Sequence, residues 1–227
     1  RIGDNMDIAA LSTTLSTIEV QSQASMAVLN KSIDNMEVMG DGMRKILESK
    51  RFEHTLGVAY TAANLAFVYG CDEKKALIAG LLHDSAKCLS HQKRLSVCKK
   101  NGIEISKVEA QNPVLLHAKV GAFFAREKYG IKDSEILDAI LYHTTGRPDM
   151  GLLEKIIYVA DFIEPHRKKL PRLNEIRKTA FEDLDMAIYM ILENSLSYLE
   201  KGNSKIDLKT KETYDFYKNV VEKRGNL

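Results

Sequence analysis

Four of the six histidines lie in apolar, helix-like stretches, and two aspartates accompany them. A buried imidazole without a hydrogen bond or a metal is costly, so each of these side chains needs a partner. One such histidine alone is more often a satisfied core residue. The whole set favours a metal centre, because nitrogen and oxygen donors together suit first-row metals. The candidate ligands are His54, His83, Asp84, His117, His143 and Asp161.

His83 and Asp84 are adjacent in the stretch GLLHDSAK. Neighbours in the middle of a helix diverge by about 100°, so the two can share a site only if the helix loosens or ends there. A carboxylate has two oxygens and can hold two ions about 3.5 to 4 Å apart. We therefore expect His83 to be a terminal ligand and Asp84 to bridge two metals.

Several cations near these candidates could bind phosphate. Arg51 and His54 are spaced i, i+3 and share a helix face, so a phosphate held by the guanidinium would lie beside the metal. Lys87 follows Asp84 by one turn, where it could stabilise a leaving group. Arg167 follows the last candidate ligand and is a weaker candidate. Lys119 is expected to be a solvated surface residue.

Two further features have open interpretations. Thr144 directly follows His143 and is either a helix cap or a substrate contact. The segment 201–217 is either an ordinary terminal helix, which we favour slightly, or a closure over the substrate with Tyr214 as a stacking side chain. His91 and His166 lie in polar contexts and are interpreted as surface residues.

The elements that must position these residues are helices. Apolar residues recur at three and four spacing from Asp41 onward, and no stretch alternates as a half-buried strand would. Ile136, Ile140 and His143 follow i, i+4, i+7, which places the histidine on a core-facing stripe; Asp161 follows Ile157 in the same way. Helix starts are predicted at four caps, which are Asp72, Asn112-Pro113, Asp133 and Thr210. The predicted fold is an all-α bundle around a metal centre.

Composition fits one main domain in 227 residues, with 44% hydrophobic and 28% charged residues. No apolar run approaches the roughly 18 residues of a membrane span, and no secretory signal is visible, so we expect a cytoplasmic protein. The three cysteines suggest free thiols rather than disulfides. The net charge of +2 includes a basic run at 166–172, which suits a small polyanion as well as nucleic acid and can also be a solvated surface.

The composition changes near Gly40 to Gly42, so we predict a helical appendage over residues 1–42 and a main domain over 43–222. The stretch MDIAALSTTLSTIEVQSQASMAVLNKSIDN resembles the start of a short family of bacterial motility proteins. We interpret it as an appendage or a misjoined leader with no role in the chemistry of the main domain.

The spaced set of His54, His83-Asp84, His117, His143 and Asp161 resembles the signature of HD-domain metal-dependent phosphohydrolases. More narrowly, RFEHTLGVA, GLLHDSAK, HAKVGA, YHTTGRPDMGLLEKIIYVADFIEPHR and FEDLDMA are similar to the YqeK-type symmetrical bis(5'-nucleosyl)-tetraphosphatases. This resemblance covers about residues 43 to 222. It implies a helical HD fold with two divalent or mixed-valence metal ions, iron first and manganese or another first-row metal as alternatives.

The resemblance also implies residue roles. His54, His83, Asp84 and Asp161 would form one metal site, with His117 and His143 completing the second. Asp84 and Lys87 would be catalytic. The substrate contacts would be Arg51, His54, Asp84, Lys87, His117, His143, Thr144 and Arg167.

The expected reaction is hydrolysis of diadenosine tetraphosphate to two ADP by a metal-activated water. One alternative is an HD phosphohydrolase acting on another nucleotide or a (p)ppGpp-like compound, and a second is a non-catalytic nucleotide-sensing module. The expected partner is a small dinucleoside polyphosphate, without nucleic acid or membrane. Helical bundles with spare apolar faces often dimerise, so a homodimer is compatible with the sequence, which does not specify it.

Overall fold

The computed structural model describes residues 50–167, 170–202 and 206–225. The chain divides into two units, residues 1–45 and 46–227, and all the described residues belong to the second. The predicted appendage over residues 1–42 lies outside the described residues and stays a prediction. Over the described ranges, no helix combines the length and the apolar character that crossing a membrane requires.

Every described element is an α-helix, as the spacing of apolar residues predicted. The helices are α3 (Lys50–Tyr69), α4 (Glu73–Leu82), α5 (His91–Lys100), α6 (Lys107–Gln111), α7 (Leu116–Glu127), α8 (Ser134–Tyr142), α9 (Leu152–Ile163), α10 (Leu173–Thr179), α11 (Leu184–Lys201) and α12 (Leu208–Lys223).

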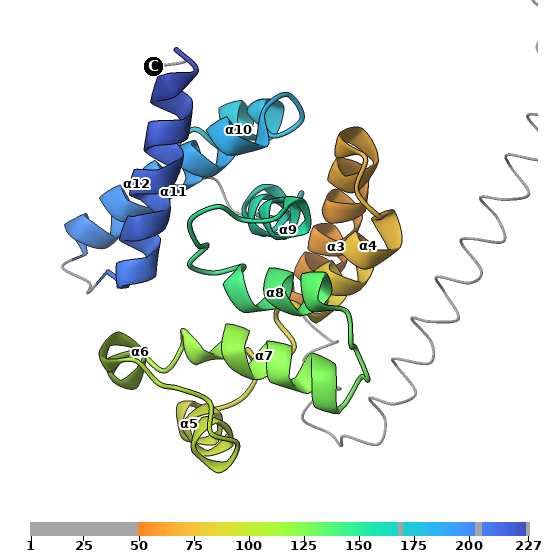
Figure 1. Cartoon of the computed structure of the whole chain (residues 1–227), viewed down its shortest axis with the longest axis vertical. Coiled ribbons are helices and arrows are strands. Elements are labelled where there is room, and N and C mark those ends of the chain that lie inside the picture. Colours follow the sequence, from red (N-terminus) through yellow and green to blue (C-terminus); the bar gives the residue numbers. More distant parts are fainter. Residues whose placement is uncertain (1–49, 168–169, 203–205, 226–227) are drawn as a thin grey trace, which may run out of the picture. The chain divides into compact units, whose positions relative to one another are not determined.

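Helix α9 is the centre of the bundle (Figure 1). It contacts α3, α4, α8 and α11, and its apolar side chains are almost all buried in the main core. A smaller apolar cluster, built around Cys98, Leu116 and Phe124, joins α5 to α7. The helices packed around α9 therefore share the main core, and α5 packs on α7 through the second cluster.

Two of the four predicted helix starts are confirmed and two are wrong. The side chains of Asp72 and Asp133 accept backbone N–H bonds at the starts of α4 and α8. Asn112 instead ends α6, and the backbone makes i to i−3 turns before α7 begins at Leu116. Thr210 lies inside α12, which Asp207 caps. At α12 the neighbouring Asp207 provides the cap, whereas α7 begins after Leu115 without any side-chain cap.

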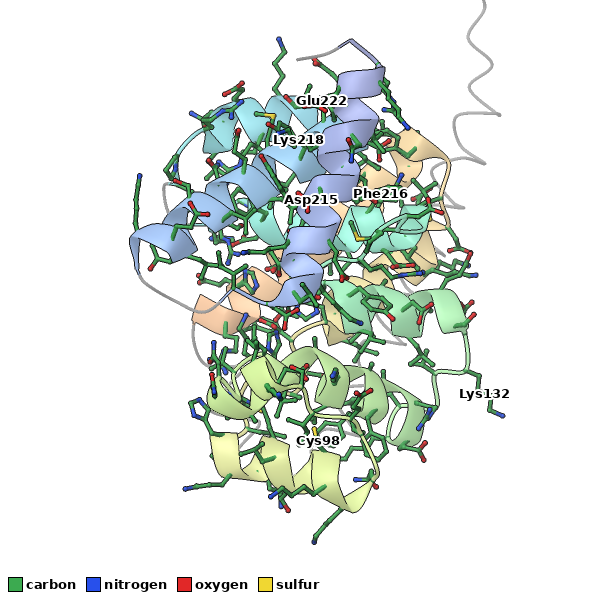
Figure 2. The ribbon with its side chains drawn as sticks, turned by 60° about the vertical axis from the view of Figure 1, so that its left-hand side comes forward. Cys98, Lys132, Asp215, Phe216, Lys218 and Glu222 are labelled. Carbon is green, nitrogen blue, oxygen red and sulfur yellow. The ribbon has the colours of Figure 1, made fainter. Side chains whose placement is uncertain are left out.

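Helix α12 is an amphipathic terminal helix. Asp215, Lys218 and Glu222 lie along it in Figure 2, whereas Tyr217 and Val221 are buried. The Tyr217 hydroxyl accepts a hydrogen bond from the backbone N–H of Met150 at 3.2 Å. Helix α12 therefore packs against the loop that follows α8.

The ring of Tyr214 stacks on Tyr189 of α11, with centroids 5.7 Å apart. This contact gives Tyr214 a packing role between α12 and α11, in line with the favoured interpretation of an ordinary terminal helix.

Candidate metal centre

The six candidate ligands converge on one place from five helices or their ends. His54 lies within α3, His117 within α7 and Asp161 within α9, while His83-Asp84 and His143 directly follow α4 and α8. The side chains of His54 and Asp161 keep 14% and 15% of their surface exposed, and the other four are buried. The site is therefore set in the core and opens to solvent on the side of His54 and Asp161.

The end of α4 lets His83 and Asp84 face the same site. The helix stops at Leu82, and the chain continues through turns to residue 89. Gly80 in the last turn of α4 has no side chain, and a Cβ there would lie 2.6 Å from the Cα of Ala59 in α3. The glycine therefore permits the close approach of the two helices that carry His83 and His54.

The two oxygens of Asp84 face different pairs of imidazoles. Asp84 Oδ2 lies 3.8 Å from His54 Nε2 and 3.6 Å from His83 Nε2. Asp84 Oδ1 lies 3.3 Å from His117 Nε2 and 3.5 Å from His143 Nε2. The carboxylate thus lies between two sets of nitrogen donors, which is the arrangement a bridging ligand requires.

Asp161 completes the set around His54 and His83. Its Oδ1 lies 3.2 Å from His54 Nε2 and 3.8 Å from His83 Nε2. Donor atoms close enough to share an ion form two triplets, His54 with His83 and Asp161, and His83 with Asp84 and His143. His83 belongs to both triplets, but His83 and His54 both face the same oxygen of Asp84, Oδ2. The Asp84 distances assign His83 to the same group as His54, because each Asp84 oxygen faces its own pair of imidazole nitrogens.

Hydrogen bonds at the far side of each ring determine which nitrogen faces the site. The Nδ1–H groups of His83, His117 and His143 donate to the carbonyls of Gly80, Val114 and Ile140, at 2.6, 2.6 and 2.7 Å. A neutral imidazole that donates from Nδ1 keeps its lone pair on Nε2. All three rings therefore present a lone pair to the centre.

Burial and charge shift the acidities within the cluster in opposite directions. Complete burial lowers the pKa of His83 to about 4, and burial also lowers the pKa of His117. Burial opposes ionisation of Asp84 and Asp161, yet the imidazoles around them hold both carboxyl pKa values below the usual range. Burial likewise opposes a charge on His54, but the acids Asp161, Glu164 and Asp84 together outweigh it and raise the His54 pKa. The cluster therefore favours carboxylates beside neutral rings at His83 and His117.

Four of the candidate donor atoms fit a metal because they have no hydrogen-bond partner among the described residues. Among the described residues, His54 Nε2, His83 Nε2, Asp84 Oδ1 and Asp161 Oδ1 are buried without a hydrogen bond. The Nε2 atoms of His117 and His143 are 3.1 Å apart. Two nitrogen lone pairs at this short distance repel each other unless a cation lies nearby. Histidine and aspartate donors in this arrangement could hold metal ions.

The family model for the HD domain matches residues 51–165, a range that contains all six candidate ligands. The chain belongs to the HD domain family. A crystal structure described as a predicted HD superfamily hydrolase involved in NAD metabolism, from Clostridium acetobutylicum, is 40% identical. It aligns over 79% of this chain and 95% of that one with a TM-score of 0.75.

Named relatives of this HD domain come from bacteria. A Bacillus subtilis (strain 168) protein named "Bis(5'-nucleosyl)-tetraphosphatase, symmetrical" is 41% identical over 77% of this chain and 92% of its own length. A Staphylococcus aureus (strain NCTC 8325 / PS 47) protein with the same name is 36% identical over 75% of this chain and 88% of its own length. A second family model, described as "Putative motility protein", matches residues 8–59.

The predicted phosphate-binding cations have different relations to the HD centre. Lys87 Nζ donates to Asp84 Oδ2 at 2.8 Å, and an Arg167 nitrogen lies 3.8 Å from Asp161 Oδ1. Arg51 forms no hydrogen bond or ion pair with any other described residue. Lys119 pairs with Glu109 at 2.8 Å, away from the ligands. Lys87 and Arg167 therefore flank the two carboxylates of the centre.

The Thr144 hydroxyl lies within hydrogen-bond distance of two candidate ligands, which a role as a helix cap does not require. Its hydroxyl is 3.1 Å from His143 Nε2 and 3.2 Å from His117 Nε2. It can donate a hydrogen bond to either lone pair. This contact favours the interpretation of Thr144 as part of the site.

Two buried charged residues near the site were missed from the sequence. Arg94 donates to the carbonyls of Lys87, Leu89 and Pro113, and so ties the turn after Asp84 to the segment before α7. Its surroundings in the sequence are polar and gave no signal of burial. Glu164 follows Asp161 by one turn and contacts His54 at 3.1 Å. An acid at the end of the apolar α9 sequence was the available signal.

Proposed function

We propose that this HD domain hydrolyses symmetric dinucleoside tetraphosphates, diadenosine tetraphosphate among them, to two nucleoside diphosphates at a two-metal centre. The observation that carries the proposal is the position of Asp84, whose two oxygens face separate pairs of imidazole nitrogens. The choice of substrate is supported by the similarity to the two named tetraphosphatases, which extends over most of their length.

The proposed ligand sets follow the Asp84 distances. His54, His83, Asp161 and Asp84 Oδ2 would hold one ion, and His117, His143 and Asp84 Oδ1 would hold the other. Iron is the metal we propose, because the resemblance to the YqeK-type enzymes implies it; manganese and zinc accept the same imidazole and carboxylate donors. When bound, such ions supply a nucleophile from water near neutral pH and neutralise charge on the phosphate.

The other residues of the site would bind and orient the phosphate chain. Lys87 and Arg167 lie beside Asp84 and Asp161, so each can pair with a phosphate oxygen that approaches the centre. Lys87 would also stabilise the charge of the departing nucleoside diphosphate. Arg51, one turn before His54 in α3, has a guanidinium without a partner among the described residues and would bind a more distant phosphate.

The proposed enzyme acts in the cytoplasm on a small molecule, without nucleic acid or membrane as a partner, and a homodimer is compatible with it. The sequence-level alternatives are a phosphohydrolase for another nucleotide and a nucleotide sensor. Neither is favoured by a specific contact within the described residues.

The products of cleavage test the proposal. We would incubate the iron-loaded full chain with diadenosine tetraphosphate and separate the nucleotides by chromatography. The expected result is two ADP for each diadenosine tetraphosphate consumed. ATP with AMP, or turnover of a (p)ppGpp-like compound in place of diadenosine tetraphosphate, would indicate the first alternative. Tight binding without turnover would indicate the second.

A further inference from the structure

Glu164 is a buried carboxylate that contacts a proposed metal ligand from behind. It ends α9, and its residue surface is 1% exposed. Its Oε1 lies 3.1 Å from Nδ1 of His54, on the side of the ring away from the centre. The same imidazole directs Nε2 to Asp161 and Asp84. His54 therefore lies between Glu164 and the proposed metal site.

The Glu164 side chain is held at its second oxygen as well. Oε2 accepts a hydrogen bond from the backbone N–H of His166 at 2.6 Å. Arg177 of α10 donates to the main-chain carbonyls of Ile163 and Glu164 at 2.9 and 2.8 Å. Both the carboxylate and the backbone that carries it are thus fixed before any metal binds.

Helix α3 leaves room for this carboxylate at Gly57. The glycine follows His54 by one turn, and a Cβ added there would lie 2.6 Å from Glu164 Oε2. That distance is shorter than real Cβ contacts, so a side chain at position 57 would displace the carboxylate. Gly57 therefore leaves free the space that the Glu164 carboxylate occupies.

His54 needs a side-chain acceptor because of its place in its helix. His83 and His143 follow the ends of α4 and α8 and donate to carbonyls of the last turn, which have no partner within the helix. His54 lies inside the twenty-residue α3, where the main-chain carbonyls nearby are engaged in the helix itself. A separate acceptor must therefore fix the orientation of this ring.

We infer that Glu164 is the positioning residue for His54. It accepts the Nδ1–H bond, holds the ring in one orientation, and leaves the Nε2 lone pair for the metal. This inference rests on the proposed metal centre and adds to it a carboxylate–histidine–metal arrangement. Partners of this kind usually change metal affinity about 10- to 100-fold when they are removed.

Manganese binding to the chelator-stripped full chain tests the inference. We would titrate Mn²⁺ and follow the free ion by its paramagnetic resonance signal. In Glu164→Gln one of the two carboxylate oxygens becomes an NH₂ group, which cannot accept a hydrogen bond. Either the His54 Nδ1–H or the His166 backbone N–H therefore loses its acceptor. We expect this variant to weaken one class of Mn²⁺ site about 10- to 100-fold and to leave the other class close to wild type.

Two further variants separate positioning from a general loss of structure. Gly57→Ala keeps the Glu164 carboxylate but displaces it, so it should weaken the same class of site. Glu154→Gln is the matched control, because Glu154 is a buried acid in the same helix, bonded to Arg147 and to a backbone N–H, outside the metal cluster. It should leave Mn²⁺ binding unchanged.

Long-range proton–nitrogen spectra of the metal-free chain provide a second readout. At a pH high enough for the His54 ring to be neutral, the wild type should show its proton on Nδ1, and Glu164→Gln should shift the proton towards Nε2. Unchanged Mn²⁺ affinity in both Glu164→Gln and Gly57→Ala, or equal losses in the Glu154→Gln control, would overturn the inference. If the wild type itself bound no Mn²⁺, the proposed metal centre would fail first and the inference with it.

Discussion

The Nε2 atoms of His117 and His143 lie 3.1 Å apart, although the two rings come from α7 and from the turn after α8. Each ring donates its Nδ1–H to a backbone carbonyl three residues earlier, so the two lone pairs face each other. Repulsion between these two lone pairs is unfavourable unless a cation lies between or beside them. The backbone therefore prepares this half of the centre for a positive ion.

Removal of His83 or Asp84 should abolish metal binding and almost all turnover. Each of His83→Ala and Asp84→Ala deletes a donor at the centre of the cluster, so the loss of affinity should exceed the 10- to 100-fold typical of an outer partner. Metal content per chain and the rate of tetraphosphate hydrolysis measure the effect. His91→Ala, at an exposed histidine, is the control. Full iron content and rate in either variant would contradict the model.

Replacement of Lys87 should impair the reaction more than metal binding. Lys87→Ala removes the cation beside Asp84, so kcat should fall about 100-fold or more while metal content stays close to wild type. Steady-state kinetics together with elemental analysis separate the two effects. Lys119→Ala, whose lysine pairs with Glu109, is the matched control and should keep the wild-type rate. An unchanged kcat in the Lys87 variant would remove this residue from the mechanism.

The Thr144 hydroxyl should contribute to catalysis without being needed for the fold. Thr144→Val keeps the shape of the side chain and deletes the group that lies near the two imidazoles. We expect kcat/KM to fall about 10-fold, the effect of losing one hydrogen bond of about 1.4 kcal/mol. Thr145→Val is the control, because the Thr145 hydroxyl donates to the carbonyl of Gly146 instead. Equal effects in the two variants would argue against a specific role.

Acid should destabilise the metal-free chain between about pH 6.5 and 4. The native His83 has a pKa of about 4, whereas a histidine in the unfolded chain titrates near 6.5. The unfolded state therefore binds more protons in this window, and the free energy of unfolding falls as the pH falls. His117 acts in the same direction, while the raised pKa of His54 adds stability that is lost only as the pH rises above about 6.5.

Thermal melts of the chelator-treated chain at pH 7 and pH 5 measure this dependence. The wild type should have the lower Tm at pH 5. A His83→Asn variant should show a smaller change in Tm between the two pH values, because it lacks the titrating group. A His83→Asn change as large as that of the wild type would show that His83 is not its source.

Deletion of residues 1–42 should leave the hydrolysis rate nearly unchanged. All the proposed ligands and cations lie between Arg51 and Arg167, outside this segment. The steady-state rate of the shortened chain, compared with the full chain at equal metal content, measures the effect. A large loss of rate would show that residues 1–42, which contain most of the match to the motility family, contribute to catalysis.

The helical class and the set of candidate ligands could be predicted from local pattern. Ile136, Ile140 and His143 follow a core-facing spacing, and all three are buried. The adjacency of His83 and Asp84 required a helix end, and α4 ends at Leu82. Such features depend on residues close together in the chain, so the sequence contains them directly. Thr210 was misjudged because the nearby Asp207 caps α12 instead, and Asn112 because it ends α6 and tight turns precede α7, which has no side-chain cap.

The sequence by itself determined which donors this HD domain possesses and that they lie on helices or at helix ends. Only the tertiary structure decided how they are divided, with Asp84 Oδ2 towards His54 and His83 and Oδ1 towards His117 and His143. The contact of Glu164 with His54 also depends on the packing of α3 against α9, made possible by a glycine. Distances between helices arise from side-chain packing across the core, and no local spacing specifies them.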